Sequence, residues 1–86
     1  MSVIVFYKRE SDHARDVIDY LHDFEKRTSH TLQEVNPDTP EGTALCELYD
    51  VVEYPTIIAT TDDGQMRDSW RGLPLPTIDE VDYYVQ

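Results

Sequence analysis

The 86-residue chain contains 18 Asp and Glu but only 7 Lys and Arg, a formal net charge of −11 at pH 7. This length supports one domain with a modest core, and no apolar run approaches the ~20 residues that cross a bilayer. The charge argues against nucleic acid as a partner, because binding to phosphates requires basic surface. Three explanations of the acidity remain open: ordinary solvation, a high-salt cytoplasm, and a basic partner.

From these properties we expect a soluble, cytoplasmic and monomeric protein, in which residues 1–86 form one domain without membrane contact. Lys8 and Arg9 follow the first apolar run, and no small-residue cleavage site is present, so no signal peptide is expected. Cys46 is the single cysteine, which excludes an internal disulfide, a Cys-x-x-Cys site and a four-cysteine metal cage.

The first half of the chain predicts a strand, a helix and a second strand. Residues 3–7 are apolar throughout, as in a central strand buried on both faces. A helix is expected from Ser11, as N-cap, to about Lys26, with negative charge in its first turn. Its apolar face comprises Ala14, Val17, Ile18, Leu21 and Phe24. Its opposite face carries a stripe of aspartates: Asp12, Asp16, Asp19 and Asp23.

Residues 31–35 alternate between polar and apolar side chains, which predicts a half-exposed edge strand. Thr39 followed by Pro40 indicates the start of a short helix that runs to Tyr49. This helix is expected to bury some of Ala44, Leu45, Leu48 and Tyr49. Cys46 lies among them and is interpreted as a small packed hydrophobe, remote from Ser11, with a regulatory or intermolecular disulfide as the alternative.

Two strands are expected over residues 56–61 and 65–70, joined by Asp62-Asp63-Gly64 as a hairpin turn. Pro55 precedes the first of them, where proline is compatible with a strand and a cis peptide is plausible. Thr77 and Glu80 form a capping box for a last helix that carries Ile78, Val81, Tyr84 and Val85. The order β-α-β-α-β-β-α predicts a four-stranded mixed α/β sheet with helices on both faces.

Two segments of the chain resemble the thioredoxin/glutaredoxin superfamily. Residues 6–14, Phe-Tyr-Lys-Arg-Glu-Ser-Asp-His-Ala, resemble the glutaredoxin segment in which Phe-Ser-Lys is followed by two residues and then Cys-x-x-Cys. Tyr54-Pro55-Thr56 resembles the cis-proline element of the superfamily, and Gly72 resembles the glycine that ends its last strand. The resemblance covers nearly the whole chain and implies a thioredoxin-like fold.

In this resemblance Ser11 and Ala14 stand at the positions of the two redox cysteines. A serine hydroxyl forms neither a thiolate at neutral pH nor a disulfide, so we expect no dithiol oxidoreductase activity and no catalytic residue. The resemblance instead implies a binding groove beside the cis-proline, made of Lys8, Ser11, Asp12, His13, Ala14, Tyr54, Pro55 and Thr56. Trp70 is interpreted either as lining this groove with Tyr7 and Tyr54 or as covering the sheet edge.

The interpretation we favour is a redox-inactive binding module for a protein or peptide, without a cofactor. The alternative is a glutathione-binding or degenerate oxidoreductase-type enzyme, because Lys8 matches the family lysine near the glutathione carboxylate. Residues 71–75, Arg-Gly-Leu-Pro-Leu, replace the family's glutathione-anchoring signature and argue against it. A third interpretation has the acidic face bind a basic partner.

Two further kinds of site were considered on the first helix and not favoured. His13 lies two positions from Ser11, and residues so spaced do not face each other on a helix, so a serine nucleophile is not expected. His13 with Asp12 and Asp16, or His22 with Asp19, could begin a metal site, but exposed carboxylate stripes are usually only solvated. We therefore expect no metal.

Overall fold

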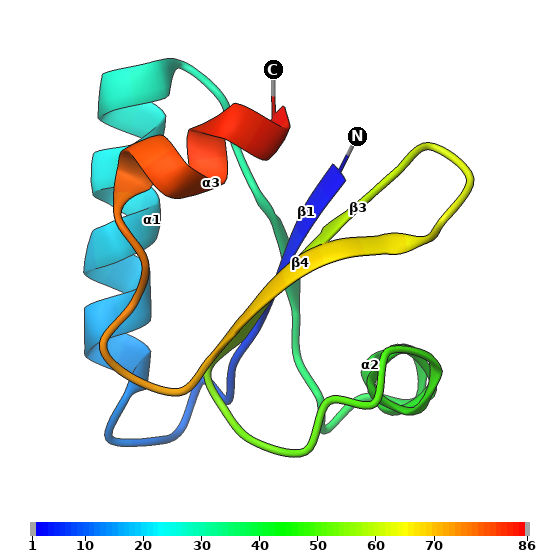
Figure 1. Ribbon diagram of the computed structural model, residues 1–86. Coiled ribbons are helices and arrows are strands. Elements are labelled where there is room, and N and C mark those ends of the chain that lie inside the picture. The colour runs from blue at the N-terminus through cyan, green and yellow to red at the C-terminus, as the bar shows by residue number, and fades with distance from the viewer. Residues whose placement is uncertain (1, 86) are drawn as a thin grey trace.

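The computed structural model describes residues 2–85 as a four-stranded sheet with helices on both of its faces (Figure 1). The elements are β1 Ser2–Phe6, α1 Ala14–Thr28, β2 Gln33–Val35, α2 Pro40–Leu48, β3 Thr56–Thr60, β4 Met66–Arg71 and α3 Ile78–Val85. The strand order is β2-β1-β3-β4; β1 and β2 are parallel, and the other two pairs are antiparallel. The predicted element order and mixed sheet are confirmed.

Alternation along β1 divides the core into two layers. Val3 and Val5 face α1 and α3, where they pack with Val17, Phe24 and other buried side chains. Ile4 faces the opposite side and packs with Val35, Cys46, Val51 and other side chains beneath α2. Successive residues of a strand point to opposite faces, so an entirely apolar strand is what a sheet covered on both sides requires.

Helix α1 begins later than predicted, and Ser11 is not its N-cap. The helix starts at Ala14, and the N-cap is His13, which makes no capping hydrogen bond through its side chain. Ser11 instead donates its hydroxyl to the Lys8 carbonyl at 2.6 Å, and the Lys8 N–H donates to Nε2 of His13 at 3.1 Å. These bonds form a turn over residues 8–13, and they use the side chains that were expected to begin the helix.

The apolar face of α1 is also rotated relative to the prediction. Ile18 is 40% exposed, whereas Val17 and Phe24 are completely buried. Tyr20, rather than Ile18, packs against the core. Its hydroxyl donates to the carbonyl of Thr77, just before α3. The segment before α3 therefore covers α1 on the Tyr20 side, a contact that the helical periodicity could not anticipate.

The caps of the two shorter helices agree with the prediction. Thr39 accepts the N–H of Gly42 at the start of α2, and Thr77 and Glu80 form a reciprocal capping box at the start of α3. The expectation that this helix buries some of Ala44, Leu45, Leu48 and Tyr49 is confirmed by Leu45 and Tyr49, which pack against the core, whereas Ala44 and Leu48 are exposed. The most buried residues of α2 are two small ones, Gly42 and Cys46.

Candidate functional site

The structure brings the two segments that resemble the superfamily next to each other. Phe6, the last residue of β1, pairs with Thr56, the first residue of β3, so the turn after β1 meets the segment before β3. The Tyr54–Pro55 peptide bond in that segment is cis. The ammonium group of Lys8 lies over the Tyr54 ring, 5.4 Å from its centroid, which joins the two segments directly.

The eight expected groove residues differ in what they can offer to a ligand. Pro55, Thr56 and Ala14 are buried and act as the floor that holds the others in place. Asp12 is exposed, and four residues are partly exposed: Lys8, Ser11, His13 and Tyr54. A ligand can therefore contact the turn before α1 and the chain at Tyr54. We expect no direct contact between a ligand and the buried residues Pro55, Thr56 and Ala14.

The backbone of Tyr54 is the most distinctive feature of this region. The Gly72 N–H donates to the Pro55 carbonyl at 2.7 Å, and the Thr56 hydroxyl donates to the Glu53 carbonyl at 2.7 Å. Between them, within residues 2–85, neither the N–H nor the carbonyl of Tyr54 has a hydrogen-bond partner. A polar backbone group that lacks an internal partner must be satisfied by water or by a ligand.

The side chain of Tyr54 connects the site to Cys46. The Tyr54 hydroxyl donates to the Cys46 Sγ at 3.6 Å, and this bond, aided by burial, raises the pKa of Tyr54 to about 12. Cys46 is 7% exposed. Cys46 packs in the core as expected. Its remoteness from Ser11 stays a prediction, and its bond to Tyr54 reaches the ring over which Lys8 lies.

We expect the substitution Cys46→Ala to lower the Tyr54 pKa toward the ordinary 10.0, because the main cause of its elevation is removed. Since the folded-state pKa is raised, the bond stabilises the fold fully below pH 10 and is lost as the pH rises through about 12. An NMR titration of the tyrosine Cζ resonances resolves Tyr54 from the other tyrosines. An unchanged Tyr54 pKa in the variant contradicts the bond to sulfur.

The electrostatic surroundings of the groove are mixed. Lys8 forms an ion pair with Asp38, whose Oδ1 lies 3.6 Å from the Lys8 Nζ. Both side chains are well exposed, so this pair is weak and can open for a ligand. Glu53 lies against Gly72, since a Cβ added to Gly72 would meet a carboxylate oxygen of Glu53 at 3.2 Å. An anionic ligand would therefore meet one lysine and two nearby carboxylates.

Two aromatic residues that were considered for the groove lie elsewhere. Tyr7 is 3% exposed and donates its hydroxyl to Glu34 at 2.7 Å. Trp70 makes an edge contact with Tyr84 of α3, with 5.7 Å between the ring centroids. The interpretation in which Trp70 covers the sheet is the one that the contacts support, and neither ring forms an open wall beside Pro55.

Comparison with solved structures decides the fold of this chain. Thioredoxin 1 from the thermophilic eubacterium Thermosipho africanus TCF52B matches it with a TM-score of 0.67 at 13% identity, over 99% of this chain and 90% of that one. Thioredoxin O2 from Arabidopsis thaliana, in its oxidized state, matches with a TM-score of 0.70 at 14% identity, over 95% and 69%. The chain has a thioredoxin-like fold. No family model and no curated protein matches its sequence.

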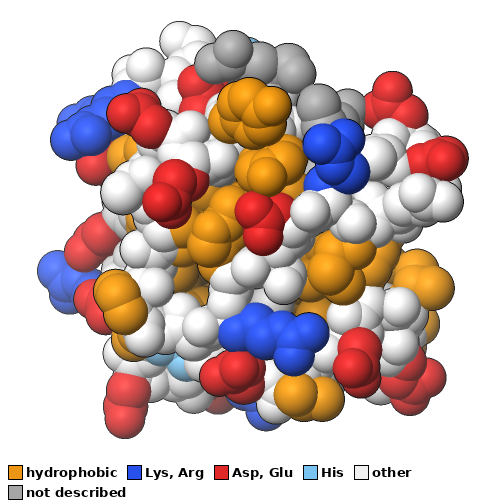
Figure 2. All heavy atoms as spheres, in the orientation of Figure 1, with side chains coloured by type: hydrophobic (Ala, Val, Ile, Leu, Met, Phe, Trp, Pro, Cys, Tyr) orange, Lys and Arg blue, Asp and Glu red, His pale blue; other side chains and the backbone are white. Residues whose placement is uncertain are grey.

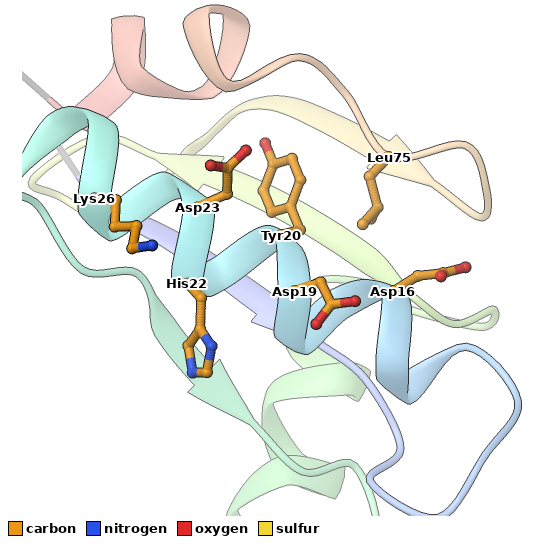
Figure 3. Close-up of a pocket in the computed structure, with 7 residues that line it drawn as sticks. All are labelled: Asp16, Asp19, Tyr20, His22, Asp23, Lys26 and Leu75. Carbon is orange, nitrogen blue, oxygen red and sulfur yellow. The ribbon is translucent and has the colours of Figure 1, made fainter.

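Beside α1 of the thioredoxin-like domain lies a wide, shallow hollow lined by Asp16, Asp19, Tyr20, His22, Asp23, Lys26 and Leu75 (Figure 3). Its carboxylates and the His22 ring point in different directions and do not converge on one point. Within residues 2–85 no three His, Cys, Asp or Glu side chains are grouped so that they could hold a metal ion. Two of the aspartates form helical ion pairs, Arg15 with Asp19 and Arg27 with Asp23.

No helix in the described part of the thioredoxin-like chain is long and apolar enough to cross a membrane.

The sequence reasoning missed two features of the site: the bond between Tyr54 and Cys46 and the ion pair between Lys8 and Asp38. Both join residues of different elements that no local pattern connects. One signal was available in the sequence. Cys46 and Asp38 both lie in the segment that connects β2 to β3, and this connection ends beside Tyr54 at the start of β3.

Proposed function

We propose that this thioredoxin-like chain is a redox-inactive binding module that takes an extended peptide against the backbone of Tyr54. The observation that carries the proposal is the free N–H and carbonyl of Tyr54 beside Pro55, at the point where pairing between β3 and β4 ends. An extended segment can satisfy both groups as an added strand does, with main-chain bonds for affinity and neighbouring side chains for selectivity.

The residues next to this backbone favour binding over redox chemistry. Ser11 and Ala14 stand where the resemblance implies cysteines, and the only thiol of the chain, Cys46, is buried between α2 and the sheet. A serine hydroxyl is not ionised near neutral pH and forms no disulfide. The proposal therefore includes no catalytic residue and no cofactor. It also retains the expectation of a cytoplasmic monomer.

Glutathione is the competing ligand, because Lys8 lies beside Tyr54 and could hold a carboxylate. Lys8 already pairs with Asp38, and Glu53 lies nearby. A tripeptide with a net negative charge gains less from such surroundings than an uncharged or basic extended segment does. We therefore favour a peptide partner over glutathione.

Amide chemical shifts of the labelled protein test the proposal when it is titrated with an unfolded polypeptide whose cysteines are carboxymethylated. We expect saturable shifts at Lys8, at residues 11–14 and at residues 53–56. These shifts should persist in high salt, since main-chain bonds beside a buried proline are screened little. Shifts confined to the aspartate stripe of α1 and abolished by salt would instead show binding of basic segments by the acidic face.

A parallel titration with reduced glutathione separates the two groove ligands. The substitution Lys8→Gln should leave polypeptide binding within about twofold, because an exposed lysine contributes little to a main-chain contact. Glutathione that is held through its carboxylate should lose most of its affinity in the same variant. Lys26→Gln, which removes the only other lysine, serves as the control. Absence of shifts at residues 53–56 with either ligand at millimolar concentration refutes the groove.

A further inference from the structure

A hollow of about 300 Å³ lies between β4 and α3, away from the groove at Tyr54. Its lining consists of three aromatic and two acidic side chains: Asp68, Trp70, Glu80, Tyr83 and Tyr84. Figure 2 shows this face of the molecule, with hydrophobic side chains gathered between α3 and β4 and acidic side chains among them. The volume is at the small end of the range for sites of small ligands.

The backbone explains why these side chains meet. Asp68 and Trp70 are two positions apart on β4 and so share one face of the strand. Glu80, Tyr83 and Tyr84 are spaced i, i+3 and i+4 on α3 and so share one face of the helix. The Tyr84 hydroxyl donates to Oδ2 of Asp68 at 3.0 Å, which ties the helix to the strand across the hollow.

The three rings pack together through two edge-to-face contacts, both of which involve Tyr84. Trp70 and Tyr84 are 5.7 Å apart between centroids with 67° between their planes, and Tyr83 and Tyr84 are 5.0 Å apart with 89° between theirs. Tyr83 is 68% exposed, a large ring held in the open. Ring faces carry partial negative charge, so a hollow lined by three aromatic rings favours a cation.

No lysine or arginine within residues 2–85 lies over these three rings. Lys8 over Tyr54 is the cation–π contact found within residues 2–85, and neither Asp68 nor Glu80 forms an ion pair with a lysine or arginine in that range. Arg67 is near enough to act on the charge of Tyr84, but it does not lie over any of the three rings. The aromatic faces and the acidic charge are therefore available to an external cation.

The composition of the lining indicates which cation fits. Oδ1 of Asp68 accepts the Ser69 N–H and its Oδ2 accepts the Tyr84 hydroxyl. One oxygen of Glu80 accepts the Thr77 N–H in the capping box. Each carboxylate oxygen can accept two hydrogen bonds, so the two acids keep acceptor sites as well as negative charge. Three of the five lining side chains are aromatic rings, whose faces attract a cation without offering a strong acceptor. A quaternary ammonium needs no hydrogen bonds, whereas a primary ammonium has three donors to satisfy.

We propose that this hollow binds a quaternary ammonium group, through the faces of Trp70, Tyr83 and Tyr84 and the charge of Asp68 and Glu80. The group is either a small free cation or the head of a trimethylated lysine on a partner protein. The site is independent of the groove at Tyr54, so either one can exist without the other.

Trp70 is the only tryptophan of the chain, so its fluorescence reports directly on this site. The intact protein is titrated with choline at constant ionic strength, and separately with 3,3-dimethylbutan-1-ol, which has the same shape without the charge. We expect a saturable change with choline and binding of the neutral alcohol that is at least about fivefold weaker, the range of partly exposed cation–π contacts. Equal binding of the two compounds overturns the proposal, as does no response to choline.

Two substitutions test the geometry with matched controls. Tyr83→Leu should weaken choline binding about three- to tenfold, whereas Tyr83→Phe keeps the ring face and should stay close to the natural protein. Glu80→Gln removes one charge but retains the capping bond to Thr77, and it should weaken choline binding a few-fold. Glu47→Gln removes an equal charge from an exposed position of α2, which covers the opposite face of the sheet, and serves as its control. Unchanged affinity in both test variants contradicts the site.

A peptide with one trimethylated lysine distinguishes the two sources of the group. Tighter binding of this peptide than of choline, together with at least about fivefold weaker binding of the unmodified lysine peptide, supports a protein partner. Equal binding of choline and the trimethylated peptide supports a small cation. Preference for the unmodified lysine peptide overturns the assignment of the hollow to a quaternary ammonium group.

Discussion

The substitution of Ser11 and Ala14 together by cysteine is expected to produce a disulfide and a disulfide-reductase activity that the natural sequence lacks. The Ala14 N–H donates to the Ser11 carbonyl at 3.2 Å, so both positions lie in one turn at the start of α1. Ala14 is 6% exposed and Ser11 is partly exposed. A cysteine at position 14 would therefore be buried, and a cysteine at position 11 would be accessible to a substrate. No side chain caps α1, so its N-terminal N–H groups can stabilise a thiolate at position 11.

The reduction of insulin disulfides in the presence of a thiol reductant measures this gain of activity. Each single substitution serves as a control, because one cysteine cannot form the pair. The double variant should also carry Cys46→Ala, so that the only remaining thiols are those at positions 11 and 14. We expect the thiol at position 11 to have a pKa below the ordinary ~8.5 of cysteine. A folded variant whose thiols neither pair nor react faster than ordinary thiols refutes this placement of the family site.

The substitution Gly42→Ala is expected to destabilise the chain by about 3 kcal/mol or more, at the upper end of overpacking effects. Gly42 is buried in the first turns of α2, and a Cβ there would lie 1.8 Å from the carbonyl oxygen of Asn36. That oxygen is held in place by the N–H and hydroxyl of Thr39. The clash is with fixed backbone, so the helix or the turn must move.

Chemical denaturation of both proteins measures the difference in the free energy of unfolding. Helix propensity alone predicts the opposite sign, because alanine is favoured over glycine by ~1 kcal/mol inside a helix. Ala44→Gly, at an exposed position of the same helix, gives the size of that propensity term without a clash. A Gly42→Ala variant that is as stable as the natural protein, or more stable, would contradict the close approach of α2 to Asn36.

Much of the fold could be predicted because its signals are local. The apolar run at β1, the Thr39 and Thr77 caps and Gly64 in a left-handed turn, with φ +86°, each depend on residues within a few positions. The order of these elements then restricts the sheet to few topologies. The prediction failed at the start of α1, where Ser11 caps a turn instead of the helix, since a hydroxyl can serve either role.

The candidate groove was only partly predictable. The segments around Lys8 and Tyr54 were identified by their resemblance, and the pairing of β1 with β3 shows that they are neighbours. The bond from Tyr54 to Cys46 and the cluster of Trp70, Tyr83 and Tyr84 were not identified. These contacts join residues up to 14 positions apart through the packing of helices against the sheet, for which the chain carries no periodic signal.

Hydrophobic periodicity, capping and composition are properties of neighbouring residues, so the helices, the strands, their order and the absence of a cysteine pair could be predicted from the chain alone. Which faces became buried and which backbone groups stayed unpaired depended on the tertiary structure. It placed Ile18 in solvent, Gly42 against Asn36 and the free backbone of Tyr54 beside Pro55. These outcomes depend on how closely two elements approach each other, a distance that is set by the packing of all the side chains between them.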